Sequence, residues 1–412
     1  MRPMIPRTVL FPLFAMLTWS ASARVHLFRA ANGSLAAVIA RAADGDTIVV
    51  DGTVREGPVV IDRSVRLFGL PGAEIDGGEV GEVLMITAPD VTVQGFIIRG
   101  TRISNLNDNA GIKVNGGARP VIRANRLIGC FFAIYLSAVR GAVVEGNTIE
   151  GHAKRDDQMG NGIHLWKCTE AIIRRNIVRD HRDGIYFEFV TDSRIEDNLT
   201  HGNVRYGLHF MFSHRDSYER NVFVDNGAGV AVMFSHHIGM RRNRFLHNRG
   251  GSAYGLLLKE INDGEITDNT FTDNTTGLMV DGCNRIKAEG NTFRTNGWAL
   301  RLFANATACT FSGNSFQGNT FDVSTNGDLK LNILEANYWD RHIGYDLDRD
   351  GHGDVPHRPV GFFALLVERV PYAIVFSRSL FVVLLDRAER VLPTLSPADL
   401  KDDRPLMRPP HG

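Results

Sequence analysis

Three consecutive stretches of the sequence share one pattern, and this pattern decides the fold. They read GIYFEFVTDSRIEDN from Gly184 to Asn198, GLHFMFSHRDSYERN from Gly207 to Asn221 and GVAVMFSHHIGMRRN from Gly229 to Asn243. Each stretch starts with glycine, places apolar residues at the first and third positions after it, and ends with asparagine 14 residues later. A repeat this short, with strand-like alternation and no helical period, is typical of one coil of a parallel β-helix.

The same pattern extends through most of the chain. The closing asparagine recurs at spacings of 22, 29, 22, 23, 22, 26, 22, 23 and 23 residues. This series consists of Asn125, Asn147, Asn176, Asn198, Asn221, Asn243, Asn269, Asn291, Asn314 and Asn337. The starting positions registered to it are Gly111, Ala133, Gly162, Gly184, Gly207, Gly229, Gly255 and Gly277. Fainter coils at residues 59–67 and 83–98 continue the series toward the N-terminus.

Stacking of the coils explains this register. A single coil cannot bury its own apolar side chains, whereas coils stacked about 4.8 Å apart form a continuous core along the axis. We therefore predict an all-β protein, a right-handed single-stranded parallel β-helix with an N-terminal capping helix and a C-terminal helical extension. Ser34 is placed to cap a short helix through Leu35, Val38 and Ile39, which would cover the open end of the core. The recurrent asparagines are expected to stack at a turn and bond neighbouring backbone, without any chemical role.

The composition excludes several classes of protein. The chain has 412 residues with 46 Lys and Arg against 46 Asp and Glu, which argues against a nucleic-acid partner. With 43% hydrophobic and 22% charged residues it can build a sizeable core, and 42 glycines argue against an all-helical bundle. The four cysteines fall on non-adjacent coils without a C-x-x-C spacing, so we expect buried thiols: Cys130, Cys168, Cys283 and Cys309.

The N-terminus has the pattern of a cleavable signal peptide. Arg2 and Arg7 precede an apolar stretch, and Ala21-Ser22-Ala23 follows it as a cleavage site of A-x-A form. The predicted organisation is therefore residues 1–23 signal peptide, 24–58 N-terminal cap, 59–343 β-helix, 344–360 Asp-rich loop, 361–393 apolar helical docking segment and 394–412 disordered tail.

Two rows of side chains are expected on one outer surface, because the second and fourth positions after each starting residue point outward. The first row is His164, Tyr186, His209, Ala231, Leu257 and Met279. The second row is Trp166, Glu188, Met211, Met233, Lys259 and Asp281. Met211 and Met233 lie on adjacent coils, and His209 is two residues from Met211 on the same face. Thioether and imidazole ligands suit Cu(I), so these three residues are the leading candidates for a metal site.

Two coils are longer than the rest and insert extra chain just before Gly162 and Gly255. Loops are where binding sites are usually built, and the first insertion contains His152 and Met159. The secondary candidate ligands are His164 on the same face and the residues that follow the patch strands, His214, His236 and His237. A sheet face that packs under loops or meets a partner is the alternative, and the pattern leaves both open.

A carbohydrate-active β-helix enzyme is a rival from another class. Trp166 and Tyr186 could stack on sugar rings, and Glu188 could act as an acid or base with Asp183 nearby. A polysaccharide lyase, hydrolase or uronate epimerase would fit this pattern. Against it, Glu188 is the only carboxylate in the exposed rows near the aromatic residues, and methionines are unusual in a sugar groove.

Two further segments follow the last coil. The first places carboxylates at alternating positions around Gly351, as a calcium loop does, through Asp346, Asp348, Asp350 and Asp354. Its twelfth position is His357 where a full loop has glutamate, so calcium and a metal-free surface turn both stay open. The second segment predicts two apolar helices that are too short to span a bilayer and that dock on a membrane, on a membrane protein or on the solenoid end. Its candidate partner-binding residues are Phe376, Leu380, Phe381 and Leu384.

These pieces together resemble the NosD family, periplasmic β-helix proteins of nitrous oxide reductase maturation. The resemblance rests on Gly162-Ile-His-Leu-Trp166, Gly207-Leu-His-Phe-Met-Phe212, the loop from Asp346 to Asp354 with Pro356-His-Arg-Pro359, and the apolar segment from Ser379 to Pro393. It spans nearly the whole mature chain. The coils alone are generic to carbohydrate-binding and sugar-hydrolase β-helices, so the specificity comes from the His/Met patch and the C-terminal segment.

The resemblance implies a non-enzymatic role in the periplasm, the transfer of copper, as Cu(I), toward nitrous oxide reductase. It also implies the partners, an ABC-type ATPase, its membrane permease and a membrane-anchored copper-chaperone lipoprotein. By the same resemblance the C-terminal helices dock on the permease. The outer-face residues Trp166, Tyr186 and Glu188 are then expected to contact a partner, with Glu188 tuning the site electrostatically.

Overall fold

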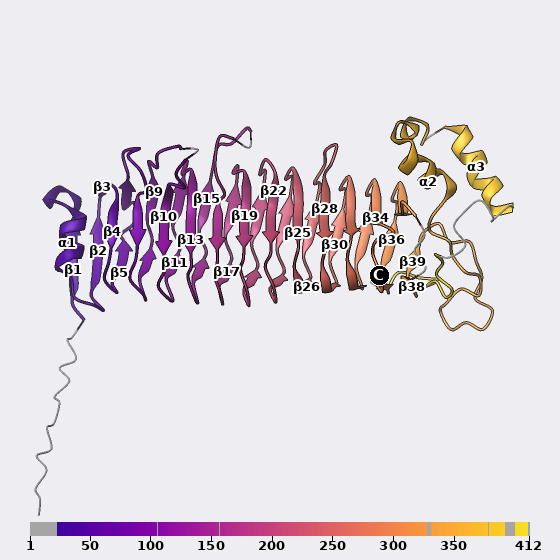
Figure 1. The fold of residues 1–412 in the computed structure, drawn as a ribbon, viewed down its shortest axis with the longest axis horizontal. Helices are drawn as coiled ribbons and strands as arrows, with labels where there is room; N and C mark the ends of the chain where they lie inside the picture. Colours follow the sequence, from indigo (N-terminus) through magenta and orange to yellow (C-terminus); the bar gives the residue numbers. More distant parts are fainter. Residues whose placement is uncertain are drawn as a thin grey trace, which may run out of the picture.

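The computed structural model describes residues 23–104, 106–155, 157–327, 331–377, 379–391 and 400–410. Over these residues the chain winds into a right-handed parallel β-helix, a long rod with α1 at one end and α2 and α3 at the other (Figure 1). The predicted fold class is therefore confirmed. The predicted signal peptide, residues 1–23, lies outside the described residues except for Ala23.

Each complete coil contributes one strand to each of three parallel sheets, which we name A, B and C, and the coils at the two ends contribute to only some of them. Within the described part of the chain they hold 14, 13 and 12 strands. Sheet A comprises β1 (Val25–Arg29), β2 (Thr47–Asp51), β5 (Arg66–Gly69), β8 (Thr92–Gln94), β11 (Val121–Arg123), β14 (Val143–Glu145), β17 (Ile172–Arg174), β20 (Arg194–Glu196), β23 (Ser217–Glu219), β26 (His236–Arg241), β29 (Asn262–Thr267), β32 (Asn284–Glu289), β35 (Thr310–Ser312) and β38 (Ile333–Glu335). Sheet B comprises β3 (Thr53–Arg55), β6 (Glu74–Asp76), β9 (Ile97–Arg99), β12 (Arg126–Ile128), β15 (Thr148–Glu150), β18 (Ile177–Arg179), β21 (Leu199–His201), β24 (Val222–Val224), β27 (Arg244–Leu246), β30 (Thr270–Thr272), β33 (Thr292–Arg294), β36 (Ser315–Gln317) and β39 (Tyr338–Trp339). Sheet C comprises β4 (Val59–Ile61), β7 (Leu84–Ile86), β10 (Ala110–Asn115), β13 (Phe132–Ser137), β16 (Ile163–Trp166), β19 (Asp183–Glu188), β22 (Tyr206–Met211), β25 (Ala228–Met233), β28 (Tyr254–Lys259), β31 (Thr276–Asp281), β34 (Trp298–Leu302) and β37 (Phe321–Ser324).

The N-terminal end is closed by the predicted helix. Helix α1 (Leu35–Arg41) follows Ser34, whose hydroxyl oxygen accepts a hydrogen bond from the Ala37 amide at 3.2 Å. Leu35 and Ile39 are fully buried against the first coil. The coils begin earlier than the predicted boundary at residue 59, because β2 and β3 already belong to sheets A and B. This coil has no glycine-to-asparagine repeat, so the pattern could not reveal it.

The core runs unbroken along the rod. The first and third positions of the repeat point inward, as in β19, where Ile185 and Phe187 are fully buried. A stack of aromatic rings occupies one interior row, with neighbouring centroids 4.2 to 5.4 Å apart. This row consists of Phe223, Phe245, Phe271, Phe293, Phe316 and Trp339. Coil-to-coil ring contact of this kind adds directional packing to the apolar burial.

The recurrent asparagines form a buried ladder at a turn, as predicted. Asn198 is representative: its side-chain oxygen accepts from the backbone and side-chain amides of Asn176, both at 3.0 Å. Its own amide donates to the carbonyl of Ile173 at 2.8 Å and to Asn221 at 2.9 Å. The sequence analysis missed a second ladder, which consists of Asn203, Asn226, Asn248, Asn274, Asn296 and Asn319. The buried polar groups of each turn are thereby hydrogen-bonded to the neighbouring coil, which holds adjacent coils in register.

The C-terminal tail closes the other end of the solenoid, and the prediction of a disordered tail is wrong for residues 400–410. Asp402 is fully buried and accepts from the backbone amides of Ala336 and Asn337 at 3.0 and 2.8 Å. It also accepts from the Trp339 indole at 3.1 Å. The carboxylate thus occupies the place of the next asparagine in the ladder. A Pro-rich, charged composition does not reveal such a contact, because the partner groups lie more than sixty residues earlier.

The predicted C-terminal helices are present. They are α2 (Phe362–Arg369), the 3₁₀ turn η2 (Pro371–Phe376) and α3 (Leu380–Val391). Phe363 and Val367 of α2 pack with Phe321 of the last coils and with Val382 of α3. Arg301 of β34 is ion-paired with Glu368 of α2 at 2.6 Å. Over the described residues, every helix falls short of the length and apolarity needed to cross a bilayer.

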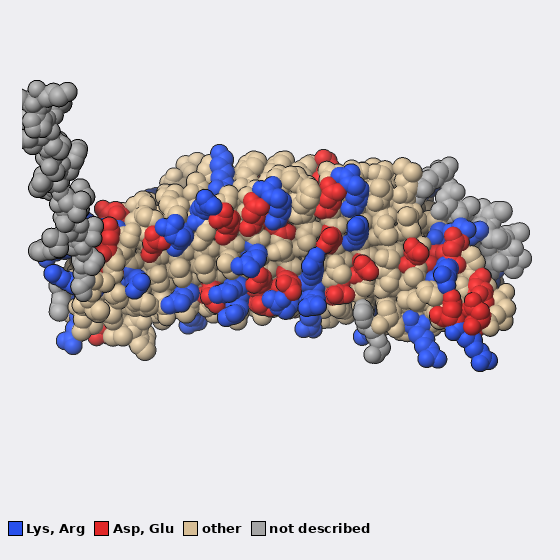
Figure 2. All heavy atoms as spheres, turned by 90° about the horizontal axis from the view of Figure 1, so that it is seen from below, with Lys and Arg blue, Asp and Glu red and all other residues tan. Residues whose placement is uncertain are grey.

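Charged side chains of both signs are mixed along the rod. Figure 2 shows Lys and Arg interspersed with Asp and Glu on one long side, without a patch of a single sign there. Bidentate pairs link successive coils, for example Arg215 with Asp192 and Arg220 with Asp197. The four cysteines are buried free thiols, as predicted.

Candidate metal centre

The outer face of sheet C carries both predicted rows. The two inserted loops, at residues 151–160 and 247–253, lead into β16 and β28 and rise from one edge of the rod (Figure 1). They therefore bracket β19, β22 and β25, the three strands between them in sheet C. These strands supply the soft side chains.

The two methionines of the patch face each other across neighbouring strands. Met211 of β22 and Met233 of β25 are direct register partners, and both side chains are half-buried. The Tyr186 hydroxyl, on the preceding strand, lies 3.8 Å from the Met211 sulfur and donates to Glu188 at 3.4 Å. Burial beside the Glu188 carboxylate raises the pKa of Tyr186 to about 12, so this hydroxyl keeps its proton. The sulfurs therefore lie in an environment that is only partly open to solvent.

His209 lies on the same strand as Met211, under a cover of aromatic rings. The residue is 6% exposed. Its ring packs edge-on against Tyr186 at 5.0 Å and obliquely against Tyr206 at 4.6 Å. Among the described residues, neither imidazole nitrogen finds a hydrogen-bond partner. A buried imidazole without partners carries a desolvation cost that a bound metal ion would offset.

A buried carboxylate stands behind His209. Asp183 is fully buried, and its Oδ2 atom lies 3.7 Å from Nδ1 of His209. The guanidinium nitrogens of Arg182 and Arg205 lie 3.8 and 3.9 Å from the same carboxylate. Asp183 thus faces one nitrogen of the ring beyond hydrogen-bond distance, and the other nitrogen has no hydrogen-bond partner among the described residues. The donor set of one imidazole and two thioethers fits Cu(I).

His164 does not join this group. It pairs in register with Tyr186, which in turn pairs with His209, so the Tyr186 ring separates the two histidines. The His164 ring is stacked between Tyr135 at 4.5 Å and Tyr186 at 4.8 Å, and its Nδ1 bonds the Asn161 amide at 3.0 Å. Burial, with a smaller effect of Arg182, lowers the pKa of His164 to about 3. His164 is an uncharged member of an aromatic stack.

The other three candidate histidines form a separate cluster beyond the turn that follows the patch. His214 and His236 are bridge partners with rings stacked at 3.8 Å, and His237 contacts His236 at 2.9 Å between the Nδ1 atoms. Partial burial and the neighbouring His236 lower the pKa of His214. These residues belong to sheet A or its edge, whereas the methionines belong to sheet C. The sequence pattern had grouped them with one patch because they follow it closely along the chain.

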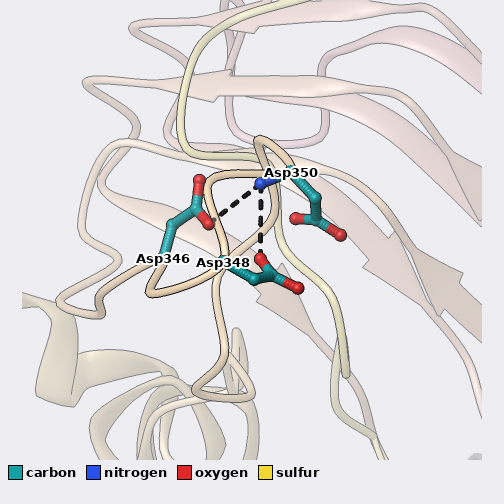
Figure 3. Close-up of side chains that lie close together, drawn as sticks. All are labelled: Asp346, Asp348 and Asp350. Carbon is teal, nitrogen blue, oxygen red and sulfur yellow. Dashed lines mark hydrogen bonds between the residues drawn. The ribbon is translucent and has the colours of Figure 1, made fainter.

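The Asp-rich loop brings three of its four candidates together. Carboxylate oxygens of Asp346, Asp348 and Asp350 lie within 4.8 Å of one another, the one such group of acidic, histidine or cysteine donors among the described residues. Figure 3 shows the first two carboxylates accepting the Asp350 amide, at 3.2 and 3.3 Å. Asp354 instead accepts the Leu347 amide at 2.7 Å, and Asp350 is paired with Arg404. Calcium in this loop stays a prediction.

The sequence analysis missed a ladder of exposed aromatic residues beside the methionines. Phe189, Phe212 and Phe234 follow Glu188, Met211 and Met233, each with a positive φ between 48° and 56°. Their rings stack at 5.4 and 5.0 Å, and the first two are 45% and 38% exposed. The same turn position also has a positive φ on other coils, at Ala138, Lys167 and Glu260, so this conformation belongs to the fold. The run of three stacked phenylalanines is what distinguishes this surface. Reading the repeat one position further would have revealed the row.

The other outer-face candidates also have partners within the chain. Trp166 is half-buried, with the Lys167 ammonium 4.2 Å from its ring centroid. Glu188 is engaged by the Tyr186 hydroxyl. The rival sugar site needs a pair of carboxyl groups open to substrate, and the second carboxyl, Asp183, is fully buried between arginines.

A cavity of about 1160 Å³ lies at the C-terminal end, away from the patch. It is lined by the last coil, the loop before α2 and the helices, with Asp322, Arg341 and His342 among its polar walls. Burial raises the pKa of Asp322 to about 6 and lowers the pKa of His342. This cavity belongs to the same end of the rod as the exposed apolar helices.

The fold and the patch together define a parallel β-helix protein with a soft, uncharged donor set on one outer face. A family described as "Periplasmic copper-binding protein (NosD)" matches residues 149–345. A protein of Pseudomonas aeruginosa named "Probable ABC transporter binding protein NosD" is 32% identical over 407 residues, which covers 91% of this chain and 93% of the relative. A protein of the same name from Stutzerimonas stutzeri is 30% identical over 379 residues, covering 86% and 85%. The chain belongs to the NosD family.

Solved structures confirm the fold alone. The A-module of the mannuronan C-5 epimerase AlgE6 of Azotobacter vinelandii superposes with a TM-score of 0.60 at 11% identity, over 71% of this chain and 90% of that one. The Dettilon tailspike protein gives 0.60 at 13% identity, over 74% and 70%. At these identities the parallel β-helix is shared, whereas the activity of those proteins carries nothing over.

Proposed function

We propose that this chain is a periplasmic copper-transfer protein that holds Cu(I) on the outer face of sheet C and passes it on during maturation of nitrous oxide reductase. His209, Met211 and Met233 are the proposed ligands. Family membership supports copper and the periplasm, and the names of the relatives support an ABC-type complex. The observation that carries the proposal is the buried His209 ring, with both nitrogens unused by the described residues, beside two registered methionines.

The ligand types suit an ion that must be released again. Thioethers and a neutral imidazole bind Cu(I) without thiolate, whose bond to copper is stronger. The four thiols do not compete, because they are buried, and burial raises the pKa of Cys130 and Cys283 to about 12. Met211 and Met233 remain half-exposed, so a soft ligand of an incoming partner can reach the ion and replace them one at a time. The protein would hand over its cargo by ligand exchange, without a change in oxidation state.

Docking is assigned to the C-terminal helices. Leu380 is 74% exposed and Phe381 56% exposed, on a helix whose buried side packs on α2. Phe376 and Leu384 are 57% and 55% exposed on the same end of the rod. A cluster of large apolar side chains in water marks a site for a partner surface. We assign it to the membrane permease of the ABC-type complex, with the ATPase on the far side of the membrane.

The ligand assignment is tested by replacing both thioethers with leucine, which keeps the volume. We expect the Met211→Leu, Met233→Leu double variant of the mature chain to lose at least tenfold in Cu(I) affinity, measured by anaerobic competition with a chromophoric chelator. Nitrous oxide reductase from cells carrying it should be copper-poor. Met279→Leu is the matched control, because Met279 lies on the same face two strands beyond Met233. Unchanged affinity and unchanged reductase copper would refute the assignment.

A further inference from the structure

The first inserted loop is fastened directly over a buried histidine. The Ala153 amide donates to the Asp180 carbonyl at 2.8 Å, and the Arg182 amide donates to the Gly160 carbonyl at 3.2 Å. Both ends of the loop are therefore bonded to the backbone on either side of His181. Gly151 fits closely against this ring, since a Cβ atom there would lie 3.0 Å from the His181 Cδ2 atom. The two ends of the loop therefore lie over the His181 ring.

The ring nitrogens of His181 are poorly paired. The residue is fully buried, and among the described residues neither nitrogen has a partner at ordinary hydrogen-bond geometry. Burial lowers the pKa of His181 to about 4, and the Gly160 backbone carbonyl, which lies near one ring nitrogen, opposes this shift. The other ring nitrogen has no partner among the described residues. Leaving a polar ring unpaired in the interior costs about 1 to 3 kcal/mol.

A sulfur and a second imidazole accompany His181. Met159 is 1% exposed, which is as buried as a core residue although it lies in a surface loop. Its sulfur accepts the backbone amide of His152 at 3.0 Å, which joins the two ends of the loop. The His152 side chain is exposed, and its charge is felt by His181. One thioether and one exposed imidazole therefore lie in the loop that covers the buried His181 imidazole.

We propose that Met159 and His181, with His152 at the entrance, form a second Cu(I) site, separate from the patch of His209, Met211 and Met233. The donor types are those that suit Cu(I), and the exposed His152 gives the ion a path from solvent to the buried pair. A loop methionine that only filled space would not explain a fully buried imidazole beneath it with an unpaired nitrogen. The choice of Cu(I) rests on the proposed function, but the site uses none of the same residues.

Copper stoichiometry of the full mature chain tests this site. Under anaerobic titration with Cu(I) against a chelator, the wild type is expected to bind two ions. Met159→Leu should bind one, with the affinity of the remaining site unchanged. Met240→Leu is the matched control, because Met240 is an equally buried methionine in the core of sheet A. His152→Ala, an exposed substitution that does not perturb packing, should weaken one of the two sites at least tenfold.

The outcomes separate the two proposals. A Met159→Leu chain that binds two ions with wild-type affinities would overturn the second site. A His152→Ala chain that binds two ions with wild-type affinities would show that His152 is not a ligand of the second site. If Met159→Leu does not fold, this result for His152→Ala would overturn the second site. Loss of one ion in Met159→Leu together with no loss in Met211→Leu, Met233→Leu would support the second site and refute the patch.

Discussion

His209 differs from His164 in one respect that decides their roles. Both rings lie on the outer face of sheet C among aromatic neighbours, and both are less than a tenth exposed. Nδ1 of His164 is hydrogen-bonded to Asn161, and the two faces of its ring stack on tyrosines. Neither nitrogen of His209 has a hydrogen-bond partner among the described residues. The register of the rows was predictable from the repeat. The difference between the two histidines was not, because it depends on which neighbour fills each side of the ring.

Asp183 should matter to copper affinity through His209. Its carboxylate lies 3.7 Å from Nδ1, so a small approach on metal binding would let it accept a hydrogen bond from the ring and orient it. We expect Asp183→Asn to weaken Cu(I) binding by about tenfold while the chain stays folded. The exposed Asp192→Asn serves as the control. Equal affinities in chelator competition for the wild type and Asp183→Asn would show that this carboxylate plays no part.

Asp216 should make the stability of the chain depend on pH. It is 1% exposed, accepts the Ser193 amide at 2.7 Å, and burial raises its pKa to about 8. Because the folded pKa lies above the unfolded one, its contribution to stability is full below about pH 4 and is lost as the pH rises through about 8. We expect Asp216→Asn to be more stable than the wild type at pH 9, by at least about 1 kcal/mol, and to show a smaller fall from pH 6 to 9. Urea unfolding at the two pH values measures this.

The control for that experiment is Asp225→Asn, since Asp225 is exposed on a turn. Curves for Asp216→Asn that parallel those of the wild type at both pH values would mean that the carboxyl ionises freely in the folded state.

At the scale of elements, the asparagine ladder holds the coils in register. Removing one rung leaves the Asn176 amide and the Ile173 carbonyl without their partner in the buried turn. We expect Asn198→Ala to lower the free energy of unfolding by about 3 kcal/mol, from two buried backbone groups at about 1 to 3 kcal/mol each. Denaturant unfolding followed by circular dichroism measures it. Asn115→Ala, at an exposed strand end, should change stability little, and a similar loss in both variants would contradict the ladder's role.

The ends of the solenoid show where sequence patterns stop being informative. The capping helix at Ser34 was predictable, because its cap and its apolar spacing are local. The role of Asp402 was not, since a single aspartate in a Pro-rich tail completes a ladder whose last member, Asn337, is far away in sequence. The second asparagine ladder and the row of Phe189, Phe212 and Phe234 were present in the repeat but lay outside the positions first aligned. Short-range sequence patterns thus predicted the coils, whereas contacts between segments distant in sequence became visible only in the three-dimensional structure.

At the scale of the whole molecule, the rod keeps the candidate metal patch apart from the C-terminal helices. The patch lies between the two inserted loops in the middle, while α2, η2 and α3 form the C-terminal end (Figure 1). Under the proposed function, the C-terminal helices would engage a membrane partner while the face with His209, Met211 and Met233 stays open to others. The near balance of 46 basic and 46 acidic residues gives no long-range steering, so contacts at these two places would determine the partners.

Attachment should depend on the exposed side of α3. We expect Leu380→Glu with Leu384→Glu to abolish co-purification of the chain with its membrane complex, because both side chains are exposed and two charges would oppose an apolar interface. Copper binding by the isolated chain should be unaffected. Arg387→Glu changes charge on the same helix without removing apolar surface and is the control. Retention of the double variant in detergent-solubilised complexes would refute docking through this helix.

The most direct measurement is an anomalous difference map at the copper absorption edge, from crystals of the full mature chain loaded anaerobically with Cu(I). We predict a peak on the outer face of sheet C within bonding distance of the His209 ring and the sulfurs of Met211 and Met233. That peak should vanish in the double leucine variant. Copper found at saturating Cu(I) only elsewhere, such as between His214, His236 and His237, would contradict the proposed site.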